Sequence, residues 1–65
     1  MTETETGYSQ LGFSAAMHAA LETEKFRNAP VGATFRIVDQ WVEITHPRES
    51  PWHITYGVTV QQSGP

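Results

Sequence analysis

The sequence contains no cysteine, and this absence removes two common ways of stabilising a small protein. Without thiols the chain can form neither disulfide bonds nor thiolate zinc sites. A chain of 65 residues buries a modest share of its surface and is marginally stable without staples or partners. Apolar residues make up 38% of the chain, which is enough for one small core. We therefore expect a single domain over residues 1–65 that associates with other copies.

Positive charge is also scarce. Only Lys25, Arg27, Arg36 and Arg48 are basic, and the net charge is −3. Four scattered cations form no basic stripe, so phosphate neutralisation on a nucleic acid is disfavoured. The sequence contains no apolar run of membrane-spanning length either. These features predict a cytoplasmic protein with neither a nucleic-acid partner nor a membrane partner.

The first third of the chain contains one helical pattern. Residues 1–7 have no apolar side chain to pack after Met1 and are expected to form a flexible tail, although alternating Thr and Glu also suit a short edge strand. Residues 12–26 are rich in alanine and predict a helix. Its apolar stripe recurs every four residues, at Phe13, Met17 and Leu21.

Two strand patterns follow, over residues 33–44 and 52–60. The segment between them contains Pro47 and Pro51, which favour a hairpin loop over a continued strand. Residues 61–65 are expected to fray. The sequence thus predicts an α+β fold with one amphipathic helix packed on a small antiparallel sheet, ordered β-α-β-β or α-β-β.

The apolar residues of the first strand occupy both odd and even positions, so they point to both faces of the strand. A register that sets Ile44 opposite Trp52 gathers the even-numbered ones on one face, which the helix can cover. That register also pairs Val42 with Ile54 and Val38 with Val58. Trp52 then closes the core over the end of the helix.

The second sheet face is left without a cover in this arrangement. It holds five candidate ligand or interface residues, namely Phe35, Ile37, Trp41, His53 and Thr55. An exposed apolar patch of this kind usually marks an interface or a ligand groove. Gly57 offers bare backbone on which the Trp41 indole can lie. We expect oligomerisation through this face, with Trp41 as its anchor.

Three stretches are similar to the dodecin family of small flavin-storing proteins: "GFSAAMHAAL", "IVDQWVEI" and "HITYGVTV". The resemblance implies a β-α-β-β fold, a hollow dodecamer and a bound flavin as the possible cofactor. Thr34 and Thr55 stand where that family has its flavin-stacking tryptophan and its ring-binding glutamine. Trp41 is then the residue left for the stacking role.

The candidates for other chemistry are few. His18, His46 and His53 lack the spacing of metal ligands, so no metal site is expected. Glu43 and His53, with Ser50 nearby, are the candidates for acid–base or nucleophilic work, but a hairpin offers no water-excluding cleft. An ordinary cross-strand pair between Glu43 and His53 is the simpler interpretation. We expect no enzyme activity.

The leading expectation is a non-enzymatic homo-oligomeric binding or assembly module, in its concrete form a dodecin-like protein that sequesters a flat aromatic ligand such as a flavin. The alternative is a small protein–protein interaction factor, such as an accessory subunit or a phage-type inhibitor. In that case the Trp41 face docks on a larger partner.

Overall fold

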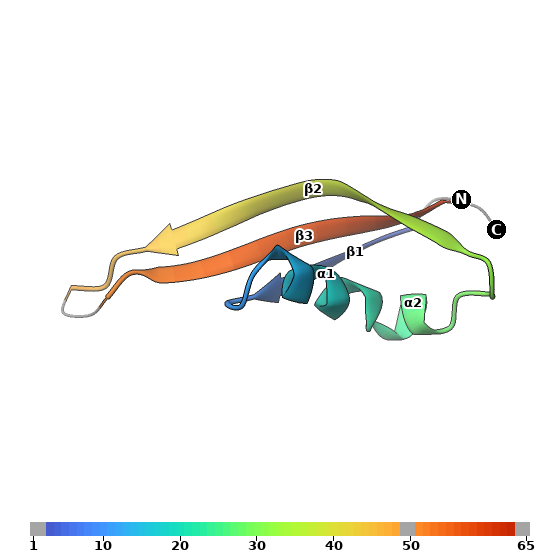
Figure 1. The fold of residues 1–65 in the computed structure, drawn as a ribbon, viewed down its shortest axis with the longest axis horizontal. Helices are drawn as coiled ribbons and strands as arrows, with labels where there is room; N and C mark the ends of the chain where they lie inside the picture. The colour runs from blue at the N-terminus through green and yellow to red at the C-terminus, as the bar shows by residue number, and fades with distance from the viewer. Residues whose placement is uncertain (1–2, 49–50, 64–65) are drawn as a thin grey trace.

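The computed structural model describes residues 3–48 and 51–63 and has an α+β fold, with two short helices on one face of a three-stranded sheet (Figure 1). The elements in chain order are β1 (Thr4–Ser9), α1 (Phe13–Leu21), α2 (Glu24–Arg27), β2 (Thr34–Thr45) and β3 (His53–Ser63). Both strand pairs are antiparallel, and the strand order is β1-β3-β2. The expected α+β class is confirmed, with a strand before the helical segment.

Strand β1 replaces most of the expected tail. It pairs with β3 from Thr4 opposite Gln61 to Ser9 opposite Tyr56. Helix α1 lies directly on β1 at Gly7, where an added Cβ atom would overlap the backbone of the helix. Residues 4–7 and 61–63 belong to the sheet, so the tail and the frayed end were expected over too many residues.

The helical segment is broken into two helices. Thr23 has extended backbone angles between α1 and α2, and its hydroxyl donates to the Ala20 carbonyl at 3.1 Å. The break turns Phe26 into the core, where it is 4% exposed and its ring centroid lies 4.9 Å from that of Phe35. The continuous helix expected over residues 12–26 would not have given Phe26 this direction.

The core lies between α1, α2 and strand β3. Its buried residues are Ala16, Ala20, Phe26, Val58 and Val60. Partly buried side chains surround them, namely Phe13, Met17, Leu21, Phe35 and Tyr56. The expected apolar stripe of the helix therefore packs on the sheet.

Strand β2 contains a one-residue bulge at Val38. Ile37 pairs with Val60 before the bulge, and Asp39 pairs with Thr59 after it. A bulge inserts one residue, so it exchanges the faces on which odd and even residues lie. The expected register is displaced by two residues, because Ile44 lies opposite Ile54 and not opposite Trp52.

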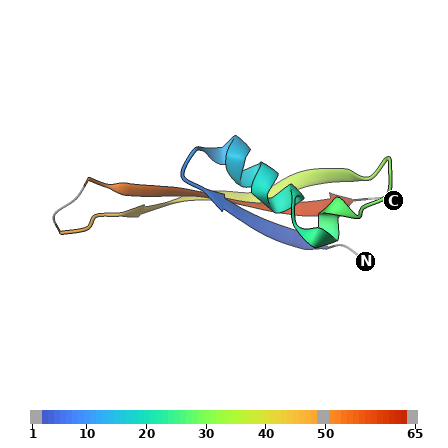
Figure 2. The ribbon, with the colours of Figure 1, turned by 90° about the horizontal axis from the view of Figure 1, so that it is seen from below.

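The molecule is elongated, with principal extents of 48 × 17 × 15 Å. Its radius of gyration is 13.9 Å, whereas a compact chain of this length has about 11 Å. Figures 1 and 2 show the cause: the β2–β3 hairpin projects well beyond the helices and β1. Within the described residues, neither helix has the length and apolar character needed to cross a membrane.

Candidate interaction surface

The sheet has a helix face, on which α1 and α2 lie, and an opposite far face. Residues directly opposed across antiparallel strands share a face, so the pairing places Phe35 and Ile37 on the helix face with Val60. Trp41, His53 and Thr55 lie on the far face. The prediction that all five form one surface is wrong, because the Val38 bulge moves the first two to the other side.

Trp41 on the far face packs mainly against its own chain. It lies opposite Gly57, where an added Cβ atom would overlap the indole, as the bare backbone of glycine suggested. The Tyr8 ring meets the indole edge-on, with centroids 5.9 Å apart and planes at 81°. The indole Nε1 donates to Glu43 Oε2 at 3.0 Å. Trp41 is therefore half-buried within one copy of the chain.

The rest of the far face is polar. The hydroxyls of Thr6 and Thr59 are 3.0 Å apart, within hydrogen-bond distance. The Arg36 guanidinium donates to the Gln61 side-chain oxygen, with distances of 3.3 and 3.2 Å. The hairpin is thus not apolar on both sides, because its far face combines one aromatic pair with a hydrogen-bonded polar surface.

A group of exposed apolar residues lies on the helix face of the hairpin. We call the described residues 42–48 and 51–56 the hairpin arm. Its side chains Val42, Ile44 and Ile54 are 40%, 61% and 41% exposed. Strand β1 ends level with Tyr56, and Phe13 at the start of α1 packs on that ring at 4.9 Å. None of the described elements lies over the part of the arm that comes before Tyr56 in β3 or after Val42 in β2.

Trp52 does not close the core. Its side chain is 60% exposed and stacks on His46, with centroids 4.0 Å apart and planes at 19°. Strand β3 begins one residue later, at His53, and Ile54 takes the place opposite Ile44. The two-residue displacement of the register therefore overturns the expected core role of Trp52.

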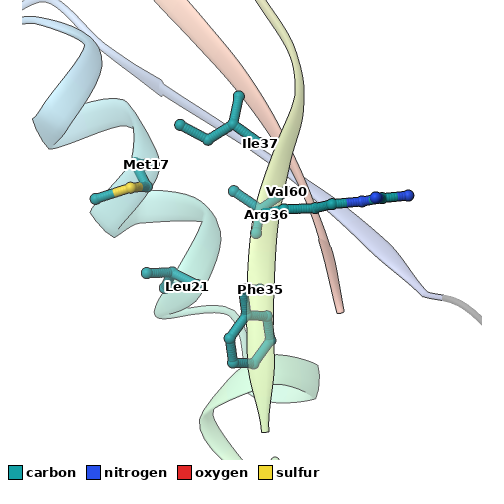
Figure 3. Close-up of a pocket in the computed structure, with 6 residues that line it drawn as sticks. All are labelled: Met17, Leu21, Phe35, Arg36, Ile37 and Val60. Carbon is teal, nitrogen blue, oxygen red and sulfur yellow. The ribbon is translucent and has the colours of Figure 1, made fainter. Parts of the chain in front are cut away.

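A small apolar pocket lies between α1 and β2. It has a volume of about 110 Å³ and is lined by Met17, Leu21, Phe35, Arg36, Ile37 and Val60 (Figure 3). The Arg36 side chain extends away from the helix, so its guanidinium is outside the pocket. The pocket continues the apolar surface of the helix face from the core toward the edge of the sheet.

Strand β2 presents a long free edge. It is the outer strand of the sheet, and among the described residues only β3 pairs with it. Neither helix lies over it as α1 lies over β1 and β3. An edge of 12 residues exposes a row of backbone donors and acceptors that another strand can use.

The described residues do not gather into a reactive cluster. Among residues 3–48 and 51–63, no three His, Asp or Glu side chains are placed to hold a metal ion. Glu43 lies opposite Thr55 and His53 opposite Thr45, so the expected directly opposed pair of Glu43 and His53 does not form. Ser50, the third candidate, lies outside the described residues.

Comparison with protein-family models, curated proteins and solved structures gives no match to this chain, so nothing in it identifies the dodecin family. The functional argument depends on the geometry alone. Sequence reasoning missed the bulge. Its signal was that the apolar residues shift from odd positions, such as Ile37, to even positions, such as Val42. It also missed the close approach of α1 at Gly7.

Proposed function

We propose that this protein is a non-enzymatic, cytoplasmic homo-oligomeric assembly module in which further copies cover the hairpin arm. The observation that carries the proposal is the exposure of Val42, Ile44 and Ile54 on a two-stranded ribbon. Such a ribbon is marginally stable in water unless something packs on its apolar face. The polar far face of the same arm makes its apolar side the one that needs a cover.

The small size of the chain supports self-association. A protein with no cysteine, whose described residues form a core of five buried side chains, has few internal means to hold an arm in place. Oligomerisation is the remaining common solution for a domain of this size. The arm then supplies contact area to its neighbour, and the neighbour supplies the missing cover.

A dodecin-like version of this proposal adds a flat aromatic ligand such as a flavin. It is supported by the order of strand, helical segment and two strands. The place for such a ring is the pair of Tyr8 and Trp41 on the far face. Thr34 and Thr55 would contribute no ring stacking, so the two aromatic side chains would carry the binding.

The same aromatic pair favours a second candidate function, docking on a foreign protein. Tyr8 is 54% exposed beside the half-buried indole, and exposed aromatic side chains are frequent anchors of protein interfaces. In this case the chain is a monomer that binds one specific larger partner through its far face.

Native mass spectrometry of the purified protein tests the proposal, because it reports stoichiometry and any retained small molecule together. We expect an assembled species of the 7.3 kDa chain. Ile54→Asp should weaken assembly, since it places a charge on the apolar side of the arm. His53→Asp is the matched control, since it lies on the same strand but on the far face.

A monomer at all accessible concentrations would refute the assembly proposal. Equal effects of the two substitutions would show that the apolar side of the arm is not the contact surface. Quenching of added riboflavin fluorescence by the wild type, lost in Trp41→Ala, would support the ligand version. No quenching and no co-purified chromophore would exclude a flavin.

A further inference from the structure

We infer that two copies join through the free edges of their β2 strands, running antiparallel about a two-fold axis that passes at Gln40. The inference rests on the proposed self-association and names one edge contact, with its register, through which two copies join. The whole of β2 takes part, since Thr34 of one copy then faces Thr45 of the other. Pairing at a free strand edge is a common mode of β-sheet association.

The side chains of β2 are self-complementary in this register. Arg36 of one copy faces Glu43 of the second copy, and the two-fold axis repeats this contact. Opposite charges that face each other across strands stabilise the pair. The apolar residues match in the same way, with Phe35 facing Ile44 and Ile37 facing Val42.

The bulge at Val38 is what makes this register possible. Residues that face each other across an antiparallel ladder must lie on the same side of the sheet. Phe35 and Ile37 lie on the helix face, as do Val42 and Ile44 beyond the bulge, while Arg36 and Glu43 both lie on the far face. In an unbulged strand an odd and an even residue could not share a face. At the centre, the bulged Val38 of each strand is the extra residue, so Asp39 faces Trp41 and Gln40 faces Gln40 of the second copy at the axis.

Neighbouring registers are disfavoured. A shift of one residue sets far-face side chains against helix-face side chains at both ends of the strand. After a shift of two residues, opposed side chains again lie on the same face, but fewer residues of β2 pair. Arg36 is then opposite Trp41 or Thr45 and not opposite Glu43. The central register alone keeps the full length of β2, the charge pairs and the apolar pairs.

The dimer would have one continuous sheet of six strands, with both pairs of helices on the same side. The exposed Val42 and Ile44 of each arm would lie beside Phe35 and Ile37 of the second copy. Those two residues line the pocket next to α1, so the arm would extend an apolar surface that the second copy already has. Two free edges would be removed in the same step.

Charged residues and bulges also serve to keep an edge strand from pairing. That function requires charges that repel or obstruct a second strand. The arrangement in β2 instead places unlike charges where the two-fold axis brings them together. The two functions predict opposite outcomes when charge-reversed variants are mixed.

The test uses the variants Arg36→Glu and Glu43→Arg. Either substitution sets like charges against each other at both contacts, so each variant alone should dimerise roughly tenfold more weakly or worse. A mixture of the two should form a heterodimer, because both contacts then join Glu to Arg. Native mass spectrometry separates the heterodimer from both homodimers by mass.

Arg27→Glu and Glu24→Arg are the matched controls, because they make the same changes in net charge on the exposed surface of α2. If net charge alone drove pairing, the control mixture would form heterodimers as the test mixture does. That result would refute the pairing of the β2 edges. If Arg36→Glu and Glu43→Arg each assemble as strongly as the wild type, the pairing of the β2 edges is refuted, while the proposed assembly stands. A monomeric wild type would refute both.

A cross-linking experiment tests the register without changing charge. Thr34 and Thr45 lie at opposite ends of β2, about 35 Å apart within one copy, but they face each other in the dimer. Opposed residues have the Cα separation that a disulfide needs. Mixed Thr34→Cys and Thr45→Cys proteins should therefore form covalent heterodimers on oxidation, and each variant alone should not. Equal cross-linking in the separate samples would overturn the register.

Discussion

At the scale of single residues, two glycines show how a missing side chain shapes this protein. Gly7 lets the backbone of α1 approach β1, and Gly57 lets the Trp41 indole lie on β3. A Cβ atom at either position would overlap its neighbour. The neighbour is backbone at Gly7 but a side chain at Gly57, so Gly57 is the site where a substitution is more easily accommodated.

Gly57→Ala should lower the free energy of unfolding by about 1–3 kcal/mol. The added methyl group displaces the Trp41 indole, which should also lose its hydrogen bond to Glu43. Chemical denaturation followed by tryptophan fluorescence measures both the stability and the altered indole environment.

Thr55→Ala is the control for that substitution, since Thr55 lies on the same strand and the same face but is directly opposite Glu43 and not Trp41. It should change stability much less. A Gly57→Ala protein with wild-type stability and an unchanged emission spectrum would show that the indole does not lie on the bare backbone.

Trp52→Ala should change the stability of one copy by less than about 1 kcal/mol, as expected for surface substitutions. The structure places Trp52 in a stack with His46 outside the core, whereas a core position would cost about 3–5 kcal/mol. Thermal unfolding under dilute conditions measures the difference. A large loss of stability there would restore the core role that the sequence suggested.

At the scale of elements, the bulge in β2 decides which side chains cooperate. It brings the odd-numbered Phe35 and Ile37 to the same face as the even-numbered Val42 and Ile44. Phe35 can therefore meet Phe26, which the break between α1 and α2 directs inward. One irregularity in a strand and one in a helix jointly produce this aromatic contact.

Deletion of Val38 should remove the bulge and force one half of β2 to turn its side chains over. If Phe35 leaves the helix face, the loss of its burial costs about 1.5–3 kcal/mol. Val38→Ala keeps the residue count and should have a much smaller effect. The comparison is made by urea denaturation of both variants, and equal stabilities would show that the parity change has no energetic role.

At the scale of the whole molecule, the elongated shape and the proposed assembly predict that folding is coupled to association. A protein stabilised by binding a second copy becomes more stable as its concentration rises. The arm of this chain, with its exposed apolar side, gives the reason to expect that coupling. If the proposed assembly forms, stability depends on the assembly and on the protein concentration.

The melting temperature should therefore rise by roughly 5 °C for each tenfold increase in protein concentration if the native state is a dimer. Differential scanning calorimetry over a hundredfold concentration range measures the trend. A melting temperature independent of concentration would indicate that the arm is stable within one copy.

Local sequence patterns predicted the elements of this fold well. The alternation over residues 52–60 indicated a strand, and Phe13, Met17 and Leu21 indicated the face of a helix that packs on the sheet. The position of the Trp41 indole on Gly57 also followed from which residue types can lie close together. These features depend on residues that are neighbours in sequence or on simple steric fit.

The register, the bulge and the strand formed by Thr4–Ser9 were not predictable in the same way. Each depends on the free energy of a complete sheet with the helices in place. The break at Thr23 and the approach at Gly7 are further examples, since both satisfy packing requirements set by distant segments.

The sequence by itself determined that this chain has no cysteine, an apolar helix stripe and more apolar strand surface than one helix can cover. Only the tertiary structure decided where the excess lies, on the helix face of the arm and not on the far face. The physical reason is that successive side chains of a strand point to opposite faces, so an inserted residue reverses the face of every side chain that follows it. One extra residue at Val38 is enough to exchange the two faces.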